Sequence, residues 1–323
     1  MRLPQPRGAL SRAVFATMTE SPDVPAALCE VAPESLGDEQ ITLWALYALH
    51  EHDFDDVDPR REWDPRLLTI RGQLEGDFEA RLRHRWADQP AASEEESDEP
   101  APIADRIFTL TEQDEGPSLA AHVHRQATAE QVCQLLRWRS LYHLREADPS
   151  TWVIPRLGPE AKAALVELQF DEYGGGRPER LHSQLFANGM AASGLDPSPG
   201  AYVDEAPDEV LEQNNAMSLF GLHRRLRGAA VGHLAAFEAT SSMPSRRMSQ
   251  GLARLGFAEE LRHYYDEHVE ADAVHEQLAA RGIAAALVAE DEALTEDVLF
   301  GAFTCLDLER RFAERALTEW EAV

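Results

Sequence analysis

Hydrophobic residues recur every three or four positions along most of the chain, which is the spacing of the apolar face of an α-helix. The first such segment covers residues 37–56, with Asp38 as its candidate N-cap, and the second covers Pro65–Trp86. Later segments predict further helices at Ala127–Ala147, Pro159–Tyr173, Arg180–Met190, Pro207–Phe220, Leu222–Ala239, Arg262–Arg281, Ala284–Glu290 and Glu296–Trp320. No alternating strand pattern, hairpin turn or internal repeat accompanies them. The predicted fold class is therefore all-α.

Three stretches lack this periodicity. Residues 1–36 are rich in proline and alanine and are predicted to form a disordered tail. Residues 88–104 are acidic, of low complexity and interrupted by proline, which predicts an exposed linker. The run Ser241–Arg247 contains a proline and is predicted to be a loop between two helices. The helical parts are then an N-terminal segment at 37–87 and a main domain at 105–323.

The charge of the chain excludes some partners. Its 58 acidic residues against 30 Lys and Arg give a formal net charge of −28. Such an acidic surface repels nucleic acid and anionic membranes, and no apolar run approaches the ~20 residues that cross a bilayer. Cys29, Cys133 and Cys305 are few, odd in number and far apart, so they form no disulfide framework. We expect a cytoplasmic protein that binds neither nucleic acid nor membranes.

The segment Arg262–Arg281 carries the pattern H-x-x-x-D-x-x-H in His268, Asp272 and His275. At about 100° per residue, Asp272 and His275 lie at about +40° and −20° from His268 on the helical wheel. Two imidazoles and a carboxylate on one stripe suit a divalent transition metal, and iron is a natural candidate. The alternative is a solvated helix face with incidental histidines, so other ligands must decide.

Acidic residues on other predicted helices could supply those ligands. Carboxylate-bridged diiron bundles combine lone glutamates from two helices with a Glu-x-x-His pair from each of two others. Glu238 lies in an apolar run without a nearby base, where an unpaired carboxylate is costly, and Glu146 ends the helix at Ala127–Ala147. Glu146 could also be a surface charge at a helix end.

Two glutamates compete as the partner of His182. Glu179 forms a Glu-x-x-His pair with His182, although it lies in a charged run that is typical of a solvated surface. Glu172 precedes three glycines, and on an unbroken helix it would lie about 80° from His182. A glycine break or a π-bulge can close that gap, so both glutamates stay open on this reasoning.

The ordered ligand-type residues resemble those of the heme-oxygenase-like diiron oxidases, also described as iron-containing redox enzymes. The set consists of Glu146, Glu172, His182, Glu238, His268, Asp272 and His275, and the similarity extends over about residues 117–281. The closest likeness is to the branch that contains an N-oxygenating domain, which has a mobile extra glutamate that matches Glu172. The resemblance thus favours Glu172 over Glu179. It implies a heme-oxygenase-like helical bundle over 105–323, with an additional N-terminal helical segment.

The resemblance also implies two irons and O2 as cosubstrate. One iron would be held by His182 with Glu146, and the other by Asp272 with His268 or His275; Glu238 would be shared or nearby. Glu172 would be the ligand that shifts. Tyr264, four residues before His268, would donate a hydrogen bond to the site or act as a redox-active phenol; simple core packing is the alternative. Heme binding is the weaker interpretation, because Glu146 stands where true heme oxygenases have their axial histidine, and His143 lies three residues earlier.

These implications predict a non-heme diiron oxidase that uses O2 and an electron donor to oxidise a small amine- or carboxylate-containing metabolite. A homodimer is a further expectation, since related proteins are often dimers. His233 and Arg227 are candidates for substrate contacts, and Arg224, Arg225 and Arg227 together could bind a carboxylate. Two alternatives stay open: a non-catalytic protein that stores or senses iron, and a helical scaffold whose acids and histidines lie on its surface.

Overall fold

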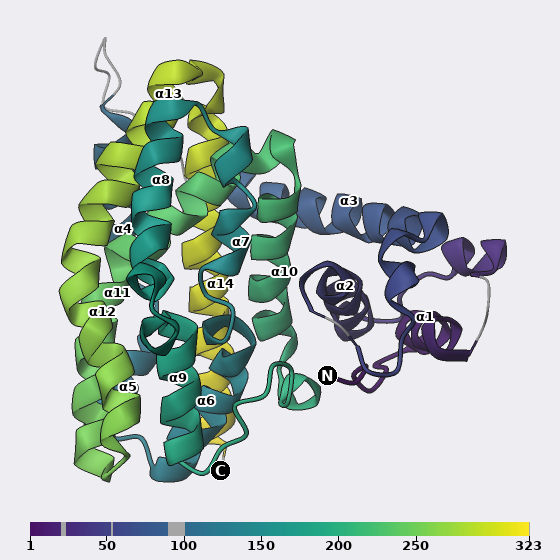
Figure 1. The fold of residues 1–323 in the computed structure, drawn as a ribbon, viewed down its shortest axis with the longest axis horizontal. Helices are drawn as coiled ribbons and strands as arrows, with labels where there is room; N and C mark the ends of the chain where they lie inside the picture. The colour runs from purple at the N-terminus through teal and green to yellow at the C-terminus, as the bar shows by residue number, and fades with distance from the viewer. Residues whose placement is uncertain (21–23, 53, 90–100, 323) are drawn as a thin grey trace.

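The computed structural model describes residues 1–20, 24–52, 54–89 and 101–322, except for the side chains of residues 270–273. Every regular element within these residues is helical, which confirms the all-α prediction (Figure 1). None of the described helices has the length and apolarity to cross a membrane. The linker predicted at 88–104 lies mostly outside the described residues and stays a prediction.

A bundle of long helices forms the main body of the molecule (Figure 1). Its centre is α11 (Arg227–Leu255), which packs between α12 (Glu259–Gln277) and α14 (Thr295–Glu321). Gly232 and Gly301 allow α11 and α14 to approach closely, because a Cβ atom at either position would overlap the backbone of the other helix. The remaining helices of the bundle are α4 (Ile103–Glu112), α5 (Leu119–Arg125), α6 (Ala129–His143), α7 (Asp148–Thr151), α8 (Pro159–Glu172), α9 (His182–Ala192), α10 (Asp208–Leu222) and α13 (Ala285–Glu290).

Local sequence signals explain several helix ends. The predicted capping of α6 is confirmed, since the Thr128 side chain accepts from the Gln131 amide and the Gln131 side chain accepts from the Thr128 amide. α8 ends before Gly174, Gly175 and Gly176, whose φ angles of 68°, 62° and 77° are accessible mainly to glycine. A Cβ atom at Gly174 would lie 2.6 Å from the backbone of Arg180. The glycine break therefore ends α8 and separates it from α9, which packs against α12.

The N-terminal part forms α1 (Ala9–Glu20), α2 (Leu36–Glu51) and α3 (Pro65–Ala87). Of these helices, α2 packs against α10 and α3 against α14, whereas α1 packs against α2 on the side away from the bundle (Figure 1). The predicted disordered tail at 1–36 is therefore wrong. The buried Asp38 carboxylate accepts from the amides of Leu10 (3.0 Å) and Ser11 (2.8 Å), and so anchors the first turn of α1. The N-cap of α2 is Ser35 rather than Asp38. Apolar residues of these helices and of the bundle form one continuous core.

The loop predicted at Ser241–Arg247 is also wrong, because α11 continues through Pro244. Near the proline, Thr240 Oγ1 donates to the carbonyl of Ala236, and Ser241 Oγ donates to the carbonyl of Phe237, both within 2.9 Å. Beyond it, the buried residues Met248 and Leu252 join the core. Tertiary packing therefore outweighs the local preference of proline to end a helix.

A buried ion pair attaches α2 to the turn between α6 and α7. Arg145 pairs with Glu51, and each side chain is 7% exposed. Ser218 Oγ of α10 accepts from Arg145 (2.9 Å) and donates to Glu51 (2.9 Å). Arg145 precedes Glu146, so this pair connects the N-terminal part to a predicted site residue.

Arg145→Met is expected to lower the free energy of unfolding by about 3–5 kcal/mol, because it leaves the Glu51 carboxylate buried without its cation. Urea denaturation of both proteins measures the difference. Arg60→Met is the control, since Arg60 pairs with Asp58 in solvent and its loss should leave stability nearly unchanged. Equal losses in the two variants would show that burial of the Arg145 pair is unimportant.

Candidate metal centre

Three buried side chains from separate elements form a first cluster, composed of Glu146, His182 and His268. Glu146 lies in the turn between α6 and α7, His182 begins α9, and His268 lies on α12. One ligand atom of each lies within 4.8 Å of those of the other two. His268 Nε2 lies 3.1 Å from Glu146 Oε1. This geometry allows the three side chains to bind one metal ion.

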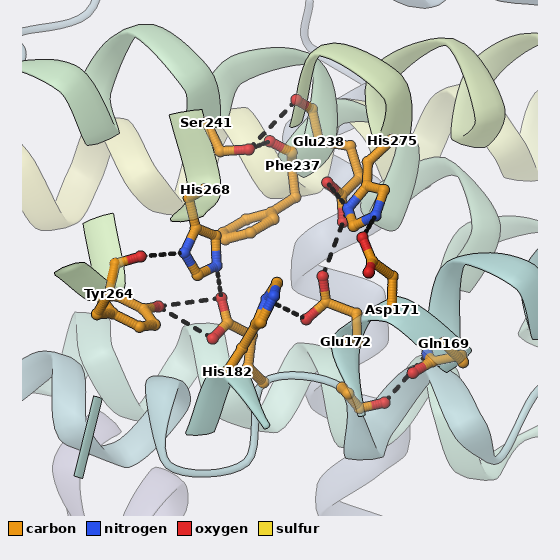
Figure 2. A network of polar contacts seen from close by, with 12 residues as sticks. Gln169, Asp171, Glu172, His182, Phe237, Glu238, Ser241, Tyr264, His268 and His275 are labelled. Carbon is orange, nitrogen blue, oxygen red and sulfur yellow. Dashed lines mark hydrogen bonds and ion pairs between the residues drawn. The ribbon is translucent and has the colours of Figure 1, made fainter. Parts of the chain in front are cut away.

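A second cluster, composed of Glu172, Glu238 and His275, meets the same criterion. Glu172 is the last residue of α8, Glu238 lies on α11 and His275 lies on α12. His275 Nδ1 is 3.5 Å from Glu172 Oε1 and 3.6 Å from Glu238 Oε2. Figure 2 shows these three side chains converging from three helices.

The two clusters adjoin each other. His182 Nδ1 of the first lies 3.0 Å from Glu172 Oε2 of the second, as Figure 2 shows. His268 and His275 belong to different clusters, because seven residues of helix separate them by about 10 Å along the axis of α12. The helical wheel places both histidines on one stripe but does not show this axial separation.

Several donor atoms of the two clusters lack hydrogen bonds. Glu172 Oε2, His182 Nδ1 and His275 Nδ1 are buried and form no hydrogen bond of good geometry among the described residues; their contacts are the ion-pair distances of 3.0–3.6 Å within and between the clusters. Buried polar atoms without partners are costly, and a bound cation would satisfy all three. Imidazole nitrogens and carboxylate oxygens are ligands that suit iron, so the residues present fit the predicted metal.

Neighbouring groups fix the orientation of two of the imidazoles. His275 Nε2 lies 2.9 Å from Asp171 Oδ2, which leaves Nδ1 facing the second cluster. His268 Nδ1 lies 2.8 Å from the carbonyl oxygen of Tyr264, which leaves Nε2 facing the first cluster. In both cases the bonded nitrogen donates and the other is available to a metal.

Tyr264 contacts the first cluster directly. Its hydroxyl donates to Glu146 at 3.0–3.1 Å and lies 2.7 Å from His143 Nδ1. Burial and the charge of Glu146 raise the pKa of Tyr264 well above its usual value, so its hydroxyl stays protonated. Tyr264 is therefore placed to orient Glu146 rather than only to fill the core.

The charges of the site influence one another. Burial opposes ionisation of Glu146, but His268 and His143 hold its pKa well below the usual value. For Glu238, burial and the nearby charge of Glu172 raise the pKa. Burial alone would lower the pKa of His275; the carboxylates of Glu238 and Glu172 outweigh it and raise the pKa to about 9.

The affinity of the second cluster for a metal is therefore expected to depend on pH. Below a pKa of about 9, His275 must release its proton before it can bind a cation, so the affinity should rise up to about tenfold per pH unit as the pH increases. Competition between the metal-free protein and a chelator for Co2+, between pH 6 and 8, measures this slope. An affinity independent of pH would exclude His275 as a ligand.

Some candidate residues, including the alternative ligand Glu179 that the resemblance disfavoured, do not reach the site. Glu179 is exposed on the surface and belongs to neither cluster. The side chain of Asp272 lies outside the described residues, so its role stays a prediction. Arg225 pairs with Glu79 and Arg227 pairs with Asp291, away from both clusters. Arg224 is exposed.

A cavity beside both clusters contains residues that the sequence analysis missed. It is lined by Glu146 and His268, by Glu172 and Glu238, and by further residues that include Gln169, Met217 and Phe220. Ala230, His233, Leu234, Phe237 and Glu238 line it from α11. Their spacing of i, i+3, i+4, i+7 and i+8 is one helix face, which is the signal that could have identified this wall. His233, a predicted substrate contact, is among them.

Comparison with known protein families identifies the family of the chain. The profile of a family described as iron-containing redox enzymes matches residues 133–310, more than half of the chain. The matched region includes all seven predicted ligand residues, whereas α1 to α3 precede it. No curated protein matches the chain.

Proposed function

The chain belongs to the iron-containing redox enzyme family, and we propose that it is a non-heme diiron oxidase that acts on a small metabolite. The observation that carries this proposal is the pair of adjoining buried clusters, which offer three donor groups each. Glu172 contacts His182 of one cluster and His275 of the other, so its carboxylate is shared by the two clusters. Other helical-bundle proteins bind pairs of iron ions through carboxylates and histidines in their cores, and this precedent supports the assignment.

Each cluster would provide the ligands of one iron ion. Glu146, His182 and His268 would hold one iron, and Glu172, Glu238 and His275 the other, with Asp272 as an additional predicted ligand. The bound iron would supply the chemistry with O2.

The surroundings would support these ligands. Tyr264 would keep Glu146 oriented, and Asp171 would do the same for His275. Glu172 stands directly before the glycine break and is the ligand best placed to shift during the reaction. The cavity would hold the substrate beside both clusters.

The substrate class and the electron donor are part of the proposal. The likeness of the sequence to the N-oxygenating branch supports a small amine-containing metabolite, and a carboxylate-containing one is the alternative. The cavity beside the clusters favours an enzyme over a protein that only stores or senses iron, because storage needs no substrate site.

Catalytic O2 consumption tests the proposal. Protein loaded with Fe2+ without oxygen and freed of unbound iron should, with ascorbate as reductant, consume more O2 than its own iron can reduce in one oxidation. Zn2+-loaded protein is the control and should consume none. A single round of O2 uptake that stops when the bound iron is oxidised would support storage or sensing instead.

A further inference from the structure

Away from the metal-binding side chains, the cavity beside the clusters is mainly apolar, with a few uncharged polar groups. Within the described residues, its lining includes no lysine or arginine. Met217, Phe220 and Leu234 give it an apolar wall, and Gln169 and His233 place polar groups within it. These features restrict the kind of molecule that the cavity can bind.

Gln169 presents a hydrogen-bond acceptor. Its Nε2 donates to the carbonyl oxygen of Ala147 at 3.2 Å, as the dashed line in Figure 2 shows. This bond fixes the orientation of the amide, because only the nitrogen can donate to a carbonyl. Gln169 Oε1 is buried and has no hydrogen-bond partner among the described residues. An unpaired buried oxygen on the wall of a cavity favours a ligand that donates a hydrogen bond.

His233 offers a second polar contact. Its imidazole packs edge-on against Phe220, and it has no hydrogen bond or ion pair with another described residue. Burial lowers its pKa to about 4, so the ring is neutral at physiological pH. A neutral imidazole can donate or accept a hydrogen bond, but it cannot neutralise a carboxylate.

The arginines that could have bound a carboxylate are engaged elsewhere. Arg225 donates to Glu79 at 2.5–2.9 Å, and Arg227 donates to Asp291 at 3.0 Å. A carboxylate in this part of the cavity would be buried without a cation and would face the Gln169 oxygen, and both effects oppose binding. An ammonium group would instead be drawn to the carboxylates of Glu146, Glu172 and Glu238, which line the same cavity and which would hold the metal ions.

We propose that the cavity binds a neutral molecule that donates an N–H or O–H group to Gln169 Oε1, contacts His233, and packs an apolar body against Met217, Phe220 and Leu234. That this molecule is the substrate rests on the proposed function. The proposal then narrows the substrate to a neutral amine, amide or alcohol and excludes binding through a carboxylate at this wall.

Ligand-detected NMR on the metal-free full chain tests the binding site without relying on iron. The probes are 1-butanol and butanoate, which have the same number of carbon atoms and differ in donor and charge. Saturation transfer should be clear for 1-butanol and at least fivefold weaker for butanoate. Gln169→Leu should reduce the 1-butanol signal at least fivefold, whereas Gln184→Leu, at an exposed position on α9, should not.

His233→Phe provides a second variant, because loss of the Gln169 bond to Ala147 could disturb the adjacent turn. It should also weaken the 1-butanol signal, with the circular dichroism spectrum unchanged. Equal binding of the two probes, or unchanged 1-butanol binding in both variants, would overturn the proposal. If wild-type protein shows the expected selectivity but binds no iron, the binding site stands and the proposed function fails. If the protein binds iron but does not discriminate between the two probes, the proposed ligand-binding site fails and the proposed function stands.

Discussion

His268→Ala is expected to lower the iron bound by each chain from about two ions to about one. The reason is the separation of the clusters: His268 contributes Nε2 to the cluster with Glu146 and His182, whereas His275 serves the other. Removing one of three donor groups should disable the first cluster and leave the second able to bind. Iron content after anaerobic loading and removal of unbound metal measures the loss.

His263→Ala is the matched control for this experiment. His263 lies on the same helix, but its side chain is 54% exposed, and it pairs with Glu267 at 3.7 Å rather than with a residue of either cluster. Its replacement should leave the iron content unchanged. Equal iron content in the His268→Ala and wild-type proteins would remove the first cluster from the account.

Glu172→Ala is expected to have a larger effect than the loss of a ligand to a single ion. The Glu172 carboxylate lies 3.0 Å from His182 Nδ1 and 3.5 Å from His275 Nδ1, so one side chain faces both clusters. Its removal should weaken both, and the iron content should fall below about one ion per chain. Far-UV circular dichroism checks that the helices persist.

Glu179→Ala is the comparison, because Glu179 forms the Glu-x-x-His pair with His182 in sequence but is exposed in the structure. It should keep the full iron content. A loss for Glu179→Ala that matches the loss for Glu172→Ala would reverse the choice between the two glutamates, which the helical wheel alone leaves open.

The helices of the bundle could be predicted from sequence because each buries one face. The apolar spacing locates α3, α8 and α14 to within about two residues, and the Thr128 capping signal locates the start of α6. The spacing fails where long-range contacts decide the structure. Asp38 orders α1 from a distance of 27 residues in sequence, and packing carries α11 through Pro244.

For the candidate site, too, the sequence predicts the residue types but not the long-range contacts between them. The residue types and their order predict a metal site and the family, and six of the seven predicted ligand residues converge in two clusters. The grouping of these residues could not be predicted, because it depends on how far apart His268 and His275 lie along α12 and on the turn at Gly174–Gly176. The free oxygen of Gln169 could not be predicted either, since only the fold shows that its amide nitrogen donates to Ala147.

The central claim is that two adjoining clusters form one diiron centre, and iron binding followed by exposure to O2 tests it most directly. Purified protein is loaded with Fe2+ under anaerobic conditions, bound iron is counted, and visible absorbance is followed after O2 is added. The account predicts close to two irons per chain and a transient visible band. No tight iron binding, or iron bound without any response to O2, would contradict it.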